Sequence, residues 1–117
     1  MNEVSHWQMV TADPDGLARF YGQVFGWRVS DANAMGYREV RTADADSVAG
    51  GIWPSPPGNP ELTQLFVQVA DIEGTLALVE QAGGRVLMPR QQLPDGDAMA
   101  MALDPAGRPF GLMTRGG

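Results

Sequence analysis

The sequence predicts an α+β fold made of two βαβββ modules, each a strand, a helix and three further strands in that order. Three observations predict it. An internal repeat relates the two halves of the chain, the same order of strand-like and helix-like patterns occurs in each half, and a proline-rich segment separates them. The 117 residues include no cysteine, and this length suits a single domain whose core needs no disulfide or metal to fold.

The repeat appears when the chain is shifted by 58 positions, which places residues 6–26 over residues 64–84 without a gap. Five of the 21 aligned pairs are identical, where chance would give roughly one or two. We therefore expect module one over about residues 1–53, a linker over 54–60 and module two over about 61–117. The identical pairs are Ala12/Ala70, Asp13/Asp71, Gly16/Gly74, Gln23/Gln81 and Gly26/Gly84.

The first module opens with a predicted strand over residues 4–10, because residue types alternate there. A helix follows, with Asp13 as its N-cap, Pro14 at its first position and Gly26 at its end. The apolar stripe of this helix is expected to lie in the core. It comprises Leu17, Phe20, Tyr21, Val24 and Phe25.

The second module repeats this pattern. Its opening strand alternates, with an apolar face of Leu65, Val67 and Val69. In the following helix we expect Asp71 to be the cap and Gly83 to supply the left-handed residue that ends it. The core stripe of this helix is predicted to be Ile72, Thr75, Leu76 and Val79.

Short strand-like runs follow each helix. They cover residues 28–30, 37–41 and 48–53 in the first half, and 85–88, 98–103 and 110–113 in the second. Residues 53–61 hold four of the nine prolines, so they connect the halves rather than form a helix or a central strand. Asp104 to Gly107 reads as a type I turn between the last two strands.

Composition excludes several classes of protein. The formal charge is −6, with no lysine and with acidic residues spread along the chain, so a phosphate-binding surface for nucleic acid is disfavoured. No apolar run has the length of a membrane span, and the first residues have no signal-peptide pattern. We therefore expect a cytoplasmic protein that binds neither nucleic acid nor membranes.

Three segments resemble the glyoxalase/bleomycin-resistance proteins, also called the vicinal oxygen chelate superfamily. They are HWQMVTADPDGLARFYGQVFGW, VADIEGTLALVEQAGGRV and LDPAGRPFGLM, and the likeness covers nearly the whole chain. The resemblance implies paired βαβββ modules whose mixed sheet curves into an open cup. It also implies that the chain pairs with a second copy as a homodimer.

The resemblance further implies where a metal would bind, because metal-dependent members place a ligand on the first and last strand of each module. Here those positions are His6, Gln64, Gly111 and a residue near Gly51 to Trp53. One imidazole and one amide are too few donors for a catalytic transition metal, so we expect no metal cofactor. Glu39 is the one acidic residue that could add a metal ligand. The alternative is that Glu39 is an exposed strand residue paired with Arg38 or Arg41.

A pocket remains as the candidate site. The faces of the opening strands that do not pack on helices would line it. Counting back from the turn at Asp104 pairs Met101 with Phe110, which leaves Ala98, Ala100, Ala102 and Gly111 facing the cup. By the same count Trp53 corresponds to Gly111 and presents its ring there. The predicted ligand-binding residues are His6, Gln8, Trp53, Gln64, Phe66, Gln68 and Gly111.

Three functions follow from this pattern. The first is metal-independent binding of a small organic molecule, since an aromatic surface with a few polar groups suits such ligands. The second is a lyase, isomerase or dioxygenase that uses a divalent metal, or His6 as acid or base. The third is a non-catalytic module whose sheet edges pair with another protein.

Overall fold

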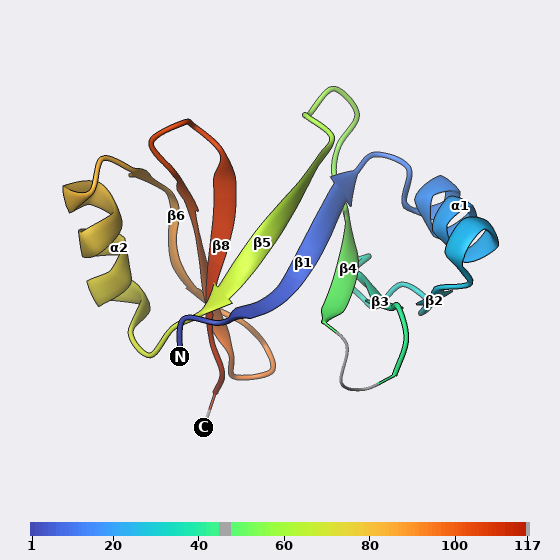
Figure 1. Cartoon of the computed structure of the whole chain (residues 1–117), viewed down its shortest axis with the longest axis horizontal. Helices are drawn as coiled ribbons and strands as arrows, with labels where there is room; N and C mark the ends of the chain where they lie inside the picture. Colours follow the sequence, from blue (N-terminus) through green and yellow to red (C-terminus); the bar gives the residue numbers. More distant parts are fainter. Residues whose placement is uncertain (45–47, 117) are drawn as a thin grey trace. The chain divides into compact units, whose positions relative to one another are not determined.

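A computed structural model of the chain describes residues 1–44 and 48–116 (Figure 1). The elements occur in the predicted order, strand, helix and three strands, twice. This confirms the α+β class and the two βαβββ modules. The bounds are β1 Val4–Thr11, α1 Pro14–Phe25, β2 Arg28–Val29, β3 Arg38–Arg41, β4 Ala49–Pro54, β5 Leu62–Gln68, α2 Ile72–Gln81, β6 Arg85–Gln92, β7 Ala98–Leu103 and β8 Pro109–Thr114.

Contacts between residues divide the chain into two units. The first unit is His6–Gln64, and the second unit is Met1–Ser5 with the chain from Leu65 onward. The N-terminal segment joins the second unit through its backbone, because the amide of Asn2 donates to the carbonyl of Gln68 and the amide of Gln68 donates to the carbonyl of Glu3.

In the first unit the strands lie in the order β2, β3, β4, β1. β1 pairs with β4 in parallel, whereas β3 pairs antiparallel with both β2 and β4. Helix α1 packs on one face of these strands, where Met9, Val40 and Ile52 form the buried core. Because strand residues alternate between faces, Gln8 and Gly51 lie on the face away from α1.

In the second unit the order is β5, β8, β7, β6, with β5 parallel to β8 and the other pairs antiparallel. Helix α2 packs on one face, against β6, β7 and β8 (Figure 1). The opposite face carries the alternate residues of each strand. The buried core under α2 consists of Val69, Ile72, Leu76, Ala98, Ala100, Ala102 and Leu112.

The helix ends follow their predicted chemistry with one exception. The Asp13 carboxylate accepts a hydrogen bond from the Gly16 amide at 3.0 Å, and Gly26 ends α1 in the left-handed conformation at φ 72°. Gly83 is also left-handed, at φ 97°. Asp71 stands at the cap position of α2, but its side chain makes no capping bond and its carbonyl oxygen bonds Thr75 instead.

The prediction that the whole apolar stripe of α1 is core was wrong. Phe20, Val24 and Phe25 are 55%, 55% and 60% exposed. A short sheet covers only the side of the helix that carries Leu17 and Tyr21, and those residues pack on the core from its border. The exposed Phe25 ring is covered in part by two half-buried rings, because it stacks on Tyr21 and on Trp27 at centroid distances of 6.2 and 5.3 Å.

The predicted pairing of β7 with β8 was wrong by one residue. Met101 pairs with Gly111 and Ala102 with Phe110, so the alanines of β7 pack under α2 and its methionines face the other way. The Asp104 turn forms as expected, since the Gly107 amide donates to the Asp104 carbonyl. Gly107 is left-handed, at φ 83°, and forms a bulge after the turn. The loop between β7 and β8 is therefore one residue longer than a plain type I turn.

Candidate functional site

In the first unit, polar residues form a row across the sheet on the face away from α1. Gln8 on β1 and Glu39 on β3 both lie in register with Gly51 on β4. Gly51 has no side chain, and the Tyr37 phenol occupies the space above it. The residues around Gly51 form the candidate site of this unit.

Two aromatic rings lie on this face next to Gly51. Tyr37, just before β3, and Trp53, on β4, contact each other with centroids 5.8 Å apart and planes at 49°. A Cβ atom at Gly51 would collide with the Tyr37 ring and hydroxyl, so the glycine makes room for this phenol. The two rings form a half-buried aromatic wall beside Gln8 and Glu39.

The electrostatics of this wall act on the phenol. Burial raises the pKa of Tyr37 above its ordinary value, and the negative charge of Glu39 raises it further. A hydrogen bond between the phenol and the Gln8 side chain opposes this shift in part. Tyr37 therefore stays protonated at neutral pH and is available as a hydrogen-bonding group.

His6 lies two residues before Gln8 on the same face of β1, in register with Ala49. It is half-buried and belongs to the first unit with Gln8 and Trp53. Gln64, the last residue of this unit, is buried on β5. We missed Tyr37, although the predicted strand over residues 37–41 already placed it on one face with Glu39 by simple alternation.

In the second unit the predicted residues Phe66, Gln68 and Gly111 share the face away from α2. Phe66 pairs with Gly111 and Gln68 with Met113 in the parallel ladder of β5 and β8. Phe66 is buried, and its ring occupies the space that a Cβ at Gly111 would need. The Gln68 carboxamide oxygen accepts a hydrogen bond from Arg115 Nε at 3.3 Å.

The register corrects one equivalence between the modules. Gly51 lies opposite Gln8, and Gly111 lies opposite Phe66, which is the repeat counterpart of Gln8. Gly51 is therefore the counterpart of Gly111. The prediction that Trp53 corresponds to Gly111 is wrong. The two closing strands are offset by 60 positions rather than the 58 of the opening strands. Trp53 still faces away from α1, because it stands two residues after Gly51.

The residues at the four positions where the family resemblance implies metal ligands do not fit a catalytic transition metal. His6 supplies an imidazole and Gln64 a neutral amide, while the closing strands offer Gly51 and Gly111. Such sites need at least three imidazole, carboxylate or thiolate ligands. Within residues 1–44 and 48–116, no three histidine, aspartate or glutamate side chains gather closely enough to hold a metal ion.

An open groove of about 490 Å³ lies elsewhere on the second unit, between α2 and β6. Its walls carry Glu73, Glu80 and Arg90, and its floor includes Leu76 and Val86. It contains no aromatic ring and none of the predicted site residues. The aromatic wall of the first unit is therefore the better candidate for a ligand with ring character.

A family model described as "Glyoxalase-like domain" matches residues 7–113. The chain belongs to this family. The match includes both modules and every predicted site residue except His6, which lies one residue before it. It places the chain in the vicinal oxygen chelate superfamily, in agreement with the resemblance of its three segments.

Two curated relatives are similar over most of the chain. CFP32 of Mycobacterium tuberculosis, named as a glyoxylase, is 31% identical over 109 residues, covering 87% of this chain and 41% of its own length. The anthracycline biosynthesis protein DnrV of Streptomyces peucetius is 31% identical over 121 residues, covering 89% of this chain and 44% of its own. The chain thus spans less than half the length of the curated relatives it matches.

A Streptomyces coelicolor methylmalonyl-CoA epimerase in complex with 2-nitronate-propionyl-CoA has a similar structure. The TM-score is 0.66 at 19% identity, over 97% of each chain. At this identity the likeness concerns the fold.

In the part of the chain that the structure describes, no helix is long and apolar enough to span a membrane.

Proposed function

We propose that this glyoxalase-like protein binds a small organic molecule without using a catalytic metal. The observation that carries the proposal is the Tyr37–Trp53 ring pair beside Gln8, with the Tyr37 phenol seated over Gly51. Aromatic surface with a few placed polar groups is the usual lining of small-molecule sites. The weak donor set at His6 and Gln64 supports the part of the proposal that concerns metal.

The binding test uses thermal unfolding with a library of small aromatic and aliphatic compounds. A ligand at a hundred times its Kd stabilises the folded state by about 2.7 kcal/mol. The substitutions Tyr37→Ala and Trp53→Phe should each reduce the stabilisation that the ligand provides. The matched control is Phe20→Ala, an exposed ring on α1, which should leave it unchanged. Equal loss in all three variants, or no stabilising compound in the library, would contradict the proposal.

The metal test is elemental analysis of protein purified without chelator. We expect below about a tenth of an equivalent of any transition metal, because two neutral donors bind one weakly. Addition of Zn, Ni, Mn or Fe should not raise the unfolding temperature. A stoichiometric metal that is lost in His6→Ala would overturn this part of the proposal.

An enzyme is the second candidate, favoured by the position of Glu39 next to Tyr37. A carboxylate and a phenol on one face are groups that can transfer protons, and His6 on the same face offers an acid or base. Once a ligand is known, a Glu39→Gln or His6→Gln variant that binds it normally but does not convert it would favour the enzyme. If the protein only binds its ligand, the unmodified protein should not convert that ligand.

We also propose a homodimer, as the family resemblance implies for a chain of this length, and a location in the cytoplasm. Light scattering at tens of micromolar should give twice the chain mass. A monomeric mass would contradict this. Capture of a different protein in stoichiometric amount, with no compound that alters thermal stability, would favour an interaction module instead.

A further inference from the structure

The outer face of α1 carries an apolar ridge that the first unit leaves uncovered. Phe20 and Val24 stand four residues apart on this helix, so they are neighbours on one side of it, and both are more than half exposed. Arg19 and Gln23 are exposed beside them. Arg19 makes no ion pair with the part of the chain that the structure describes. We call Arg19, Phe20 and Val24 the α1 ridge.

The open groove between α2 and β6, about 490 Å³ in volume, offers an apolar surface on the second unit. Leu76 belongs to the core under α2 and Val86 packs against that core, and both also line the groove. Pro89 lies on the β6 wall. Ala77, on the α2 wall, is small and exposed, so the wall is low at this point. A protruding ring can therefore lie across Ala77 and contact the apolar floor.

The charge of this groove is complementary to that of the α1 ridge. Glu73 and Glu80 stand seven residues apart on α2, one before Ala77 and one after it, so they share its face of the helix. Neither carboxylate forms an ion pair within residues 1–44 and 48–116. On the other wall, Arg90 Nη2 donates to Gln92 Oε1 at 3.2 Å. Two carboxylates against one guanidinium leave the groove with one net negative charge, whereas the ridge carries one positive charge.

Of the two carboxylates, Glu80 gains more from a cation that binds beside it. Glu80 lies in the last turn of α2, where the helix dipole places partial negative charge, and residues 78–81 include no basic side chain. Glu73 lies in the first turn, at the positive end of the same helix, so its charge is already favoured there. An arginine brought to Glu80 by another chain would offset both the carboxylate and the helix end.

We propose that the α1 ridge of one copy docks in the α2–β6 groove of a second copy, with Phe20 over Ala77 and Arg19 beside Glu80. The inference rests on the proposed homodimer and names the two surfaces that form it. A helix that lays apolar side chains into a groove is a recurring mode of recognition. The occupant is a second copy because one sequence supplies both halves of the contact. In a dimer with two-fold symmetry the contact occurs twice, since each copy has one ridge and one groove.

The experiment measures self-association of the full chain by sedimentation equilibrium in low salt. Arg19→Glu and Glu80→Arg should each weaken association about ten- to hundredfold, because each brings like charges together. Both positions are exposed, and arginine suits the last turn of a helix, so the variants should fold. The double variant, and an equimolar mixture of the two single variants, should regain association because opposite charges meet again. The matched control is Arg108→Glu, on the exposed turn between β7 and β8, which should leave association unchanged.

The apolar part of the contact has its own pair of variants. Phe20→Ala should weaken association about tenfold or more, because an aromatic anchor that fills a groove carries much of the binding energy. The matched control is Leu78→Ala, which should have no effect. Leu78 is the counterpart of Phe20 in the 58-residue repeat, is also exposed, and does not line the groove. The α1 ridge and the Tyr37–Trp53 pair lie on opposite sides of the sheet, so Phe20→Ala should not alter ligand stabilisation.

The outcomes separate this inference from the proposed homodimer. A dimer whose dissociation constant is the same in Arg19→Glu, Glu80→Arg and Phe20→Ala would overturn the inference and leave the homodimer standing. A monomeric mass of the unsubstituted protein would overturn both. Loss of association in Arg19→Glu that mixing with Glu80→Arg does not restore would also overturn the inference, because the ridge would then meet a different surface, such as the ridge of the second copy.

Discussion

The ring of Phe66 lies where the side chain of residue 111 would be, and Gly111 is what permits this. The two residues are direct partners in the parallel ladder of β5 and β8. Phe66 is 1% exposed, so its ring has little room to move away. The absence of a side chain at Gly111 is therefore a packing requirement.

Gly111→Ala should accordingly destabilise the protein by about 1–3 kcal/mol, because overpacking forces the ring off its rotamer or shifts the backbone. Urea unfolding gives the measurement. The matched control is Gly22→Ala, inside α1, where a new Cβ would make only an ordinary contact 3.5 Å from the Trp27 carbonyl oxygen. That change should stabilise by about 0.5–1 kcal/mol, since alanine favours helix over glycine. Similar effects of both substitutions would contradict the packing account.

Tyr37 should make the stability depend on pH in the alkaline range. Its folded pKa is raised by burial and by Glu39, so the folded state holds the phenolic proton more tightly than the unfolded state. This contribution is fully present below the ordinary pKa of 10.0 and is lost as the pH rises through the folded value. Urea unfolding midpoints should be measured between pH 9 and 11, a range that brackets the ordinary pKa of tyrosine of about 10. The midpoint should fall with rising pH in the unsubstituted protein and fall less in Tyr37→Phe. Parallel curves would exclude Tyr37 as the source.

Glu61 should tie the proline-rich connector to the end of β1 in a pH-dependent way. Hydrogen bonds from the Thr11 side chain and the Ala12 amide lower the pKa of this exposed carboxylate, the latter at 2.8 Å. The contact is present above the ordinary pKa and is lost as the pH falls through the lowered one. Glu61→Gln should speed hydrogen exchange at the Ala12 amide at neutral pH. Glu73→Gln, on α2, serves as the control, and unchanged exchange in Glu61→Gln would refute the contact.

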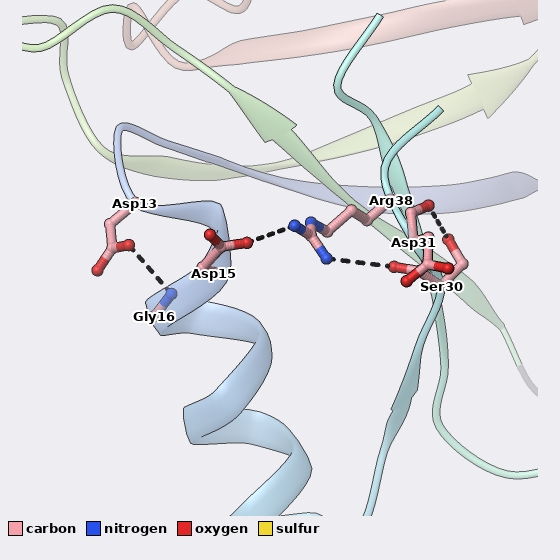
Figure 2. A network of polar contacts seen from close by, with 6 residues as sticks. All are labelled: Asp13, Asp15, Gly16, Ser30, Asp31 and Arg38. Carbon is pink, nitrogen blue, oxygen red and sulfur yellow. Dashed lines mark hydrogen bonds and ion pairs between the residues drawn. The ribbon is translucent and has the colours of Figure 1, made fainter. Parts of the chain in front are cut away.

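Arg38 anchors α1 to β3 in two ways that substitutions should separate. Its guanidinium pairs with Asp15 and reaches the Ser30 carbonyl at 3.5 Å, as Figure 2 shows. Asp15 is largely exposed, so Asp15→Asn should cost under about 1 kcal/mol and less in high salt. Arg38→Ala should cost more, because the Arg38 side chain is only 22% exposed and its stem packs on neighbours. Equal costs in urea unfolding would mean that the ion pair, and not the packing, is the anchor.

The candidate site was predictable to the extent that it follows from alternation along single strands. The faces of Gln8 and Phe66 were assigned correctly from their own strands, and Trp53 reached the correct face through an incorrect equivalence. Tyr37 was missed because nothing local marks a phenol that inserts over a glycine on the next strand. The face to which Met88 turns depends on two register shifts in β6, which no residue pattern in the sequence indicates.

The sequence by itself determined the duplicated order of strand, helix and three strands, the caps at Asp13 and Gly26, and the faces of β1 and β5. These features depend on local periodicity and on backbone chemistry within a few residues. Only the tertiary structure decided the register of β7 against β8, where one left-handed glycine moved Met99 and Met101 to the face away from α2. It also decided that the aromatic residues of α1 remain exposed, because burial depends on the area of the sheet beneath the helix and not on the helical pattern.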